Sequence, residues 1–270
     1  MMISTMSADG TTATATMKGS GPAILIVHPG LDDGTAWRKV TDILAEQFTV
    51  FNIVRRQYRD DIHQPVSIAN EVADVAAICG VLQPPVMVVG HSSGGVVALE
   101  ALAARPDLFV GGSVYEPPVD TGQPIGGEAP EHAVQAIAEN KPGKAIQIFT
   151  RDMVGLPAGQ SRMIRILVGL SPKLKRLAPG QIADNVAMRD LGTRLDTYAG
   201  IELPVLLIGG DQSPAHLGER LEVLARTIPH TERVLLDGQG HSANQRAPHR
   251  LAASITDFYN RILLSVKETH

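Results

Sequence analysis

Short apolar runs alternate with longer segments of helical spacing along most of the chain, and this rhythm constrains the fold more than any other feature. The runs that we expect to form strands are Thr11 to Met17, Ala23 to Val27, Phe48 to Val54, Val86 to Val89, Val110 to Tyr115, Val205 to Ile208 and Arg233 to Leu236. The segments that we expect to be helical are Thr35 to Gln47, Ser67 to Leu82, Val96 to Ala104, Pro214 to Thr227 and Pro248 to Leu264. Strands that alternate with helices form a mostly parallel sheet with helices on both faces. We therefore predict an α/β fold with a mostly parallel central sheet flanked by helices.

The rhythm stops between Asp120 and about Gly200, where helical stretches are broken by Gly and Pro and no strong strand pattern occurs. An insertion at this point would lie over the carboxyl edge of the strands, where open α/β sheets bind ligands. We predict a core domain made of residues 1–119 and 201–270, and a helical cap or lid made of residues 120–200.

Composition excludes several classes of protein. Of the 270 residues, 44% are hydrophobic and 19% are charged, so a sizeable core is expected and a disordered chain is excluded. A net charge of −4 argues against nucleic-acid binding, which needs a basic surface. The single cysteine, Cys79, excludes an internal disulfide and a cysteine-cluster metal site, and we expect it to be a buried helix residue.

Targeting and cofactor motifs are absent from the sequence. The first residues lack a basic segment followed by an apolar core, and no apolar run approaches the ~18 residues of a membrane span. Neither an H-E-x-x-H zinc motif nor a G-x-G-x-x-G after a strand occurs. We therefore expect a cytoplasmic protein with no metal or cofactor, no nucleic acid and no membrane as partner. The sequence leaves open whether it forms a homo-oligomer.

The segment Gly90-His91-Ser92-Ser93-Gly94 matches G-x-S-x-G, a strand-to-helix turn that presents a nucleophilic serine. An apolar strand leads into it and a helical segment leads out. Glycine lets such a turn be tight and pass close to its neighbours, and the strained serine then exposes its hydroxyl at a helix N-terminus. We predict that Ser92 is a catalytic nucleophile. The alternative is a glycine–serine helix cap without chemistry.

A serine nucleophile needs a base, and histidine is the usual one. His241 ends the glycine-containing loop Asp237-Gly238-Gln239-Gly240-His241, directly after the last predicted strand. That position lies at the same edge of the sheet as Ser92, so we predict that His241 is the base. His91 is adjacent to Ser92, and we expect its side chain to point away into packing. The other histidines have no comparable setting.

An acyl-transfer site also needs two N–H groups that bind the oxyanion. One should come from Ser93, the residue after the nucleophile. The other should come from the loop after the strand Ala23 to Val27. Because Pro29 has no N–H, we predict Gly30 as the second donor, with Leu31 in reserve. The alternative is an ordinary turn at the end of a strand.

These motifs resemble the α/β-hydrolase fold family over nearly the whole chain. The matching pieces are Asp9-Gly10, Gly19-Ser20-Gly21-Pro22, His28-Pro29-Gly30, GHSSGG, Glu116-Pro117-Pro118, Gly209-Gly210-Asp211 and Gly240-His241. The resemblance implies a Ser-His-acid triad in the order Ser…acid…His and a helical cap. Members of the family often carry an Arg-Gly turn after the strand that corresponds to Phe48 to Val54. Here that turn begins Arg55-Arg56-Gln57 and lacks glycine, and we expect its arginines to be solvated or structural.

Two carboxylates compete for the third place in the triad. Asp211 follows the strand Val205 to Ile208, the usual place for the family's acid, although the family spacing Gly-x-x-Asp puts Gln212 or Ser213 in that slot. Glu116 closes the preceding strand, and certain haloalkane dehalogenases of this fold take their acid from that strand. We favour Glu116, because a charged residue that closes an apolar strand at this edge of the sheet suits the role. We keep Asp211 as the alternative acid. Either carboxylate could instead be a loop residue without a catalytic role.

The sequence predicts a serine hydrolase that cleaves an ester or related acyl bond of a small molecule through an acyl-enzyme. Ser92 in the nucleophile position argues against dehalogenase and epoxide hydrolase chemistry, where the family uses a carboxylate. C–C bond hydrolysis, lactone opening and cofactor-free haloperoxidase activity share the same apparatus and remain alternatives. A non-catalytic ligand-binding member of the fold is the alternative from another class.

Overall fold

The predicted mostly parallel sheet is confirmed. A computed structural model describes residues 1–82, 86–122 and 128–268, and they contain one eight-stranded sheet in the order β1-β2-β4-β3-β5-β6-β7-β8. The strands are β1 (Met2–Met6), β2 (Thr12–Lys18), β3 (Ala23–Val27), β4 (Thr49–Ile53), β5 (Val86–His91), β6 (Phe109–Tyr115), β7 (Val205–Gly210) and β8 (Thr231–Leu236). The pairs β1·β2 and β2·β4 are antiparallel, and every pair from β4 to β8 is parallel.

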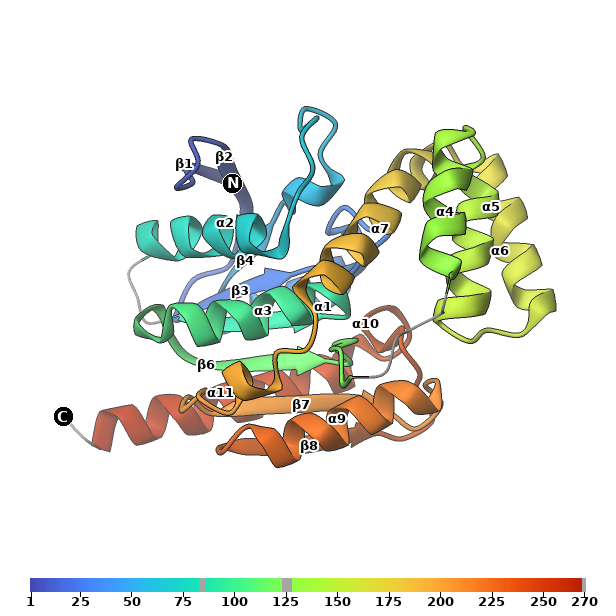
Figure 1. The fold of residues 1–270 in the computed structure, drawn as a ribbon. Helices are drawn as coiled ribbons and strands as arrows, with labels where there is room; N and C mark the ends of the chain where they lie inside the picture. The colour runs from blue at the N-terminus through green and yellow to red at the C-terminus, as the bar shows by residue number, and fades with distance from the viewer. Residues whose placement is uncertain (83–85, 123–127, 269–270) are drawn as a thin grey trace.

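Helices cover both faces of this sheet (Figure 1). On one face lie α2 (Ile68–Val81), α3 (Ser93–Ala104) and α9 (Ala215–Thr227), and on the other lie α1 (Arg38–Leu44) and α11 (Pro248–Glu268). Side chains of a strand point alternately to the two faces, so a strand buried on both sides is apolar throughout. In β5, Val86 and Val88 pack with α3, whereas Met87 and Val89 join the opposite apolar cluster.

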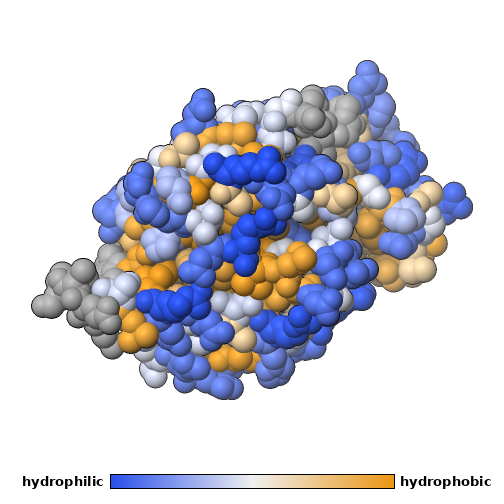
Figure 2. All heavy atoms as spheres, turned by 90° about the horizontal axis from the view of Figure 1, so that it is seen from below, coloured by the Kyte–Doolittle hydropathy of each residue, from blue (hydrophilic) through white to orange (hydrophobic). Residues whose placement is uncertain are grey.

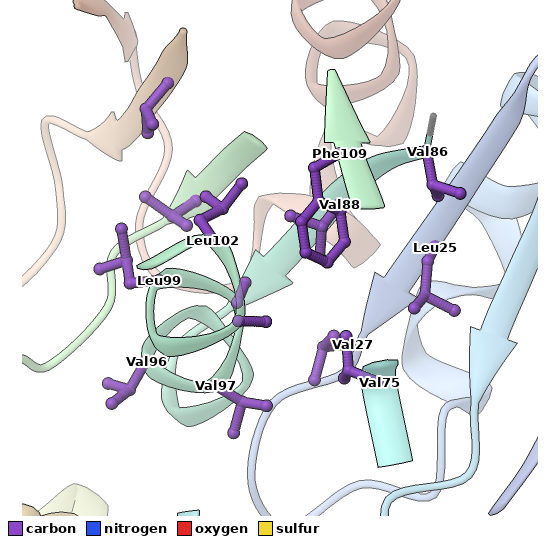
Figure 3. Packing of buried hydrophobic residues seen from close by; sticks show 14 of the residues in the cluster. Leu25, Val27, Val75, Val86, Val88, Val96, Val97, Leu99, Leu102 and Phe109 are labelled. Carbon is purple, nitrogen blue, oxygen red and sulfur yellow. The ribbon is translucent and has the colours of Figure 1, made fainter. Parts of the chain in front are cut away.

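Figure 3 shows how α3 is held against the sheet. Val96, Val97, Leu99 and Leu102 of α3 lie beside Leu25 and Val27 of β3 and Val88 of β5, and all belong to one buried cluster. Full burial of such a side chain contributes roughly 1.5–3 kcal/mol. The packing therefore fixes the N-terminus of α3, and with it the turn that holds Ser92.

The segment that breaks the strand–helix rhythm is helical. It contains α4 (Ala129–Ala138), α5 (Pro142–Ile148), the π-helical turn η4 (Phe149–Met153), α6 (Ala158–Leu170), α7 (Pro172–Leu191) and α8 (Leu195–Tyr198). Helices α4 to α7 share an apolar cluster of their own, separate from the two clusters of the sheet. In Figure 1 they stand beyond the carboxyl ends of the strands, and α7 runs back toward the sheet. Residues 123–127 of the predicted cap lie outside the described residues, and its boundaries at 120 and 200 stay a prediction.

The sequence reading missed β1, whose residues are alternately exposed and half-buried at the edge of the sheet. The helical pattern expected from Val96 to Ala104 extends back to Ser93, so that α3 leads directly out of the turn of the predicted nucleophile, as the motif requires. At the opposite edge, Leu235 of β8 is 66% exposed. Figure 2 shows apolar and hydrophilic residues interspersed on the face of the molecule seen from below. None of the described helices is both long enough and apolar enough to span a bilayer.

Candidate active site

Ser92 lies in a strained turn between β5 and α3. Its backbone angles, φ 53° and ψ −127°, are unusual for a residue with a side chain. A hydrogen bond of 2.9 Å from the Ser92 N–H to the Tyr115 carbonyl, and one of 2.7 Å from the Gly95 N–H to the Ser92 carbonyl, fix this backbone. Glycine is needed at position 94, because a Cβ there would clash with the carbonyl oxygens of Val27 and His28. The turn therefore has the strained geometry that the motif predicted.

Glu116 and His241 form a direct pair. The Glu116 Oε2 atom lies 2.6 Å from His241 Nδ1, and the Glu116 Oε1 atom accepts a 2.7 Å hydrogen bond from the Gly210 N–H. Glu116 is 1% exposed and adopts a positive φ of 46° at the end of β6. Since a carboxylate only accepts hydrogen bonds, Nδ1 is the ring nitrogen that carries the proton of the neutral ring, and Nε2 carries none.

Asp211 takes no part in this pair. It follows β7 in an exposed turn, and its side chain has no hydrogen bond or ion pair within the described residues. The backbone of the same turn contributes instead, because Gly210 donates to Glu116. Of the two candidate acids, the structure thus brings Glu116 and not Asp211 to His241, which supports the assignment that we favoured.

The two predicted oxyanion segments converge beside Ser92. The loop from His28 to Leu31 follows β3, and Leu31 has a positive φ of 51°. This loop passes close to the start of α3, and it can do so because position 94 is a glycine. Across residues 1–82, 86–122 and 128–268, we find no acceptor for the backbone N–H groups of Gly30, Leu31 or Ser93. All three N–H groups are therefore free to donate to a bound molecule, which is what the predicted oxyanion site requires.

These groups line one cavity of about 840 Å³. Ser92, Ser93, Gly30 and His241 are all part of its wall. Much of the remaining wall is apolar. It comes from both the sheet side and the helices of the predicted cap: Leu31, Pro118, Phe149, Met153, Val154, Leu174, Met188 and Leu217. Basic side chains also border it, namely Arg38, Lys39, Lys173 and Arg189. A cavity of this size and lining fits a small organic molecule.

Comparison with known proteins identifies the family. Residues 24–254 match the model of the alpha/beta hydrolase family. The chain belongs to this family. Its structure is similar to that of an alpha/beta hydrolase from Sphaerobacter thermophilus, with a TM-score of 0.83 and 27% identity over 95% of this chain and 100% of that one. A thermophilic esterase from Thermogutta terrifontis shares the fold with a TM-score of 0.77 and 20% identity over 97% and 99% of the two chains.

Two relatives by sequence are named for their substrates. A 2-(acetamidomethylene)succinate hydrolase from Mesorhizobium japonicum is 27% identical over 89% of each chain. A pimeloyl-[acyl-carrier protein] methyl ester esterase from Xanthomonas campestris is 23% identical over 88% of this chain and 97% of its own. The family resemblance read from the motifs is thereby confirmed, and with it the placing of this protein among hydrolases.

In this α/β hydrolase a buried aromatic group surrounds the histidine loop. His91 is buried, stacks on Tyr115 with ring centroids 4.5 Å apart, and lies 4.7 Å from the His241 ring. Trp37 Nε1 donates to His91 Nδ1 at 3.2 Å. The Tyr115 hydroxyl donates to the Gly240 carbonyl and accepts from the Ala243 N–H. The expectation that His91 packs was correct, but this packing supports the loop of His241.

Burial and the neighbouring His241 hold the pKa of His91 well below its usual range, so its ring is neutral. A neutral His91 places no positive charge beside the His241 ring.

Three residues of the site region have surroundings that the sequence did not indicate. Of the two roles expected for Arg55 and Arg56, solvated or structural, the structure shows the structural one: they are 2% and 4% exposed and are held by buried carboxylates. His216, which sequence had given no setting, is half-buried in the cavity wall. Burial, followed by the charge of Arg220, lowers its pKa. The sequence offered no signal for the contacts of the two arginines, since Glu71 and Asp74 lie 16 and 18 residues away from them. Within the described residues, no group of three or more His, Cys, Asp or Glu side chains could hold a metal ion.

Proposed function

We propose that this α/β hydrolase is a serine hydrolase that cleaves an ester or related acyl bond through an acyl-enzyme. The observation that carries the proposal is the Glu116–His241 pair, whose histidine lines the same cavity as Ser92. A buried carboxylate that holds Nδ1–H leaves Nε2 of His241 as a base, and Ser92 is the hydroxyl that the strained turn presents to the same cavity.

The reaction proceeds in two halves. In the first, Nε2 of His241 removes the Ser92 proton while Oγ attacks the substrate carbonyl, and Glu116 stabilises the imidazolium that forms. The oxyanion accepts hydrogen bonds from the N–H groups of Ser93 and Gly30. His241 then returns the proton to the leaving alcohol. In the second half, His241 takes a proton from water, the resulting attack releases the acid, and Ser92 regains its proton.

The cavity suggests what kind of substrate is bound. Its apolar side chains, among them Phe149, Met153 and Leu217, fit an aliphatic acyl chain or alcohol. A relative named as a methyl ester esterase supports an ester as the bond that is cleaved.

A second candidate is a substrate that carries a carboxylate. Arg38 and Lys39 border the cavity and have no ion-pair partner among the described residues. A relative is named for a succinate derivative, which is consistent with an anionic substrate. On this candidate, Lys39→Gln would raise KM for the monoester of a dicarboxylic acid about threefold to tenfold and leave KM for a neutral ester unchanged.

The test of the proposed function is nitrophenol release from p-nitrophenyl esters of increasing acyl length. We expect turnover by the unmodified protein, loss of it in Ser92→Ala, and labelling of Ser92 by a fluorophosphonate. Ser242→Ala is the matched control, because Ser242 lines the same cavity and should keep turnover within about threefold. Equal turnover in Ser92→Ala and the unmodified protein would refute the proposal. Labelling of Ser92 without ester turnover would direct the search to other acyl or C–C bonds.

A further inference from the structure

Arg55 is a buried cation close to the nucleophile. It follows β4 and precedes the short turn η2 (Arg56–Tyr58). Its Nε and Nη2 atoms donate to the two oxygens of Glu71 on α2, at 2.9 and 2.6 Å. Nη2 also donates to Asp184 of α7 at 2.9 Å. A guanidinium held in this fork geometry by two buried carboxylates has a fixed position and orientation.

The remaining side of the guanidinium faces the oxyanion segments. Its Nη1 atom donates to the Ser93 Oγ atom at 2.8 Å and to the His28 carbonyl at 3.2 Å. Ser93 carries one of the proposed oxyanion donors, and His28 lies two residues before the other, Gly30. One planar group therefore contacts both segments on which the oxyanion site depends.

Helix α7 of the predicted cap joins the same arrangement. Asp184 is fully buried and also accepts a 2.7 Å hydrogen bond from the Tyr58 hydroxyl. One turn earlier, Gln181 lies against Gly30 so closely that a Cβ on Gly30 would clash with its Oε1 atom. The oxyanion loop is thus enclosed between α7 and Arg55, and Asp184 connects the two.

We propose that Arg55 is a positioning residue for the oxyanion site, holding the His28–Leu31 loop and the Ser93 end of α3 at the spacing at which both N–H groups reach one oxygen. Asp184 holds the guanidinium in place from the cap side. This role rests on the proposed function. It follows from geometry, since oxyanion donors act only within about 2.7–3.1 Å of the oxyanion, and a small displacement of either segment weakens them.

Arg56 supplies a matched control. It is also buried and also held by α2, through Asp74, with a further bond of 2.6 Å to Asp9. No bond from it to His28 or Ser93 is present. Replacing either arginine by lysine disturbs a buried ion pair, but only at position 55 does the change also release the oxyanion segments.

The experiment compares Arg55→Lys with Arg56→Lys on a p-nitrophenyl ester. For Arg55→Lys we expect kcat to fall about tenfold to hundredfold with KM within about threefold, because lysine has no planar fork to reach all four partners. Binding of a boronic acid, which mimics the tetrahedral intermediate, should weaken by a similar factor. Arg56→Lys should keep kcat and boronic acid affinity while its melting temperature falls as much as that of Arg55→Lys.

The second variant, Ser93→Ala, removes the Oγ acceptor and keeps the backbone donor. It should lower kcat about threefold to tenfold without raising KM, and it serves the test where Arg55→Lys does not fold. The proposal is overturned if kcat is unchanged in both Ser93→Ala and Arg55→Lys. It is also overturned if Arg55→Lys does not fold and kcat is unchanged in Ser93→Ala. So would equal losses of kcat in the two lysine variants. If Ser92→Ala keeps its turnover, the proposed function falls too; if only the Arg55 results fail, the proposed function stands.

Discussion

The carboxyl ends of β6 and β7 are neighbours in the sheet, and each is followed by an acidic residue, yet the two ends are built differently. At the end of β6, Glu116 is buried, has a positive φ and binds His241. At the end of β7, Asp211 lies in an exposed turn, and its neighbour Gly210 contributes a backbone N–H to Glu116. Sequence position alone therefore does not assign the acid, whereas burial and backbone conformation distinguish the two.

Backbone strain also distinguishes the end of β6 from the end of β7. The described residues other than glycine with a positive φ are Leu31, Ser92, Glu116 and Asn140. Three of these four follow β3, β5 and β6: Leu31 and Ser92 line the cavity, and Glu116 binds His241, which also lines it. Such conformations cost about 1–3 kcal/mol each and persist where the surrounding structure enforces them, often at functional sites. The end of β7 carries no such residue.

The largest effect should come from neutralising each acid in turn. Glu116→Gln would place an amide against Nδ1 of His241 and favour the wrong tautomer, so we expect kcat/KM for a p-nitrophenyl ester to fall about 10⁴-fold. Asp211→Asn should stay within about threefold, because its side chain has no partner among the described residues. A large loss in Asp211→Asn together with retained turnover in Glu116→Gln would reverse the assignment.

A smaller loss of activity should follow from a change in the backbone at the end of β7, where the Gly210 N–H donates to Glu116. In Gly210→Ala the new Cβ would clash with the Gln239 carbonyl, in the loop that carries His241. We expect kcat/KM to fall about tenfold to hundredfold, because both Glu116 and His241 would be displaced.

Gly218→Ala on α9 is the control for that change, since a Cβ there meets no atom within 4 Å. Its kcat/KM should be unchanged, measured on the same ester. Equal rates in the two alanine variants would show that the end of β7 tolerates displacement and that the pair is held by β6 alone.

The sequence predicted the features that depend on local pattern. The solid apolar strands and the glycine-rich turn around Ser92 are determined by residues close together in the chain, as is the position of His241 after the last strand. The contacts of Arg55 were beyond reach, because Glu71, Asp184 and Ser93 lie 16, 129 and 38 residues away. The strained φ of Glu116 was equally invisible, since it arises from tertiary contacts and not from residue type.

The end of a third strand, β3, should affect how the stability of the fold depends on pH. His28, at the end of β3, is buried, and burial followed by the charge of Arg55 lowers its pKa to about 3. The folded protein therefore keeps His28 neutral, whereas the unfolded chain binds a proton below its ordinary pKa of about 6.5. Stability from this group is fully present above that pH and is lost as the pH falls toward 3, at about 1.4 kcal/mol per pH unit.

The measurement is urea unfolding between about pH 4 and pH 6. His28→Gln should reduce the dependence of the unfolding free energy on pH by about 1.4 kcal/mol per unit, whatever its effect on stability at pH 7. His249→Gln is the control, because His249 is exposed and its removal should leave the slope unchanged. An unchanged slope in His28→Gln would mean that this ring is protonated in the folded protein. The end of β3 would then resemble the end of β7, where Asp211 is exposed, more than the end of β6, where Glu116 is buried.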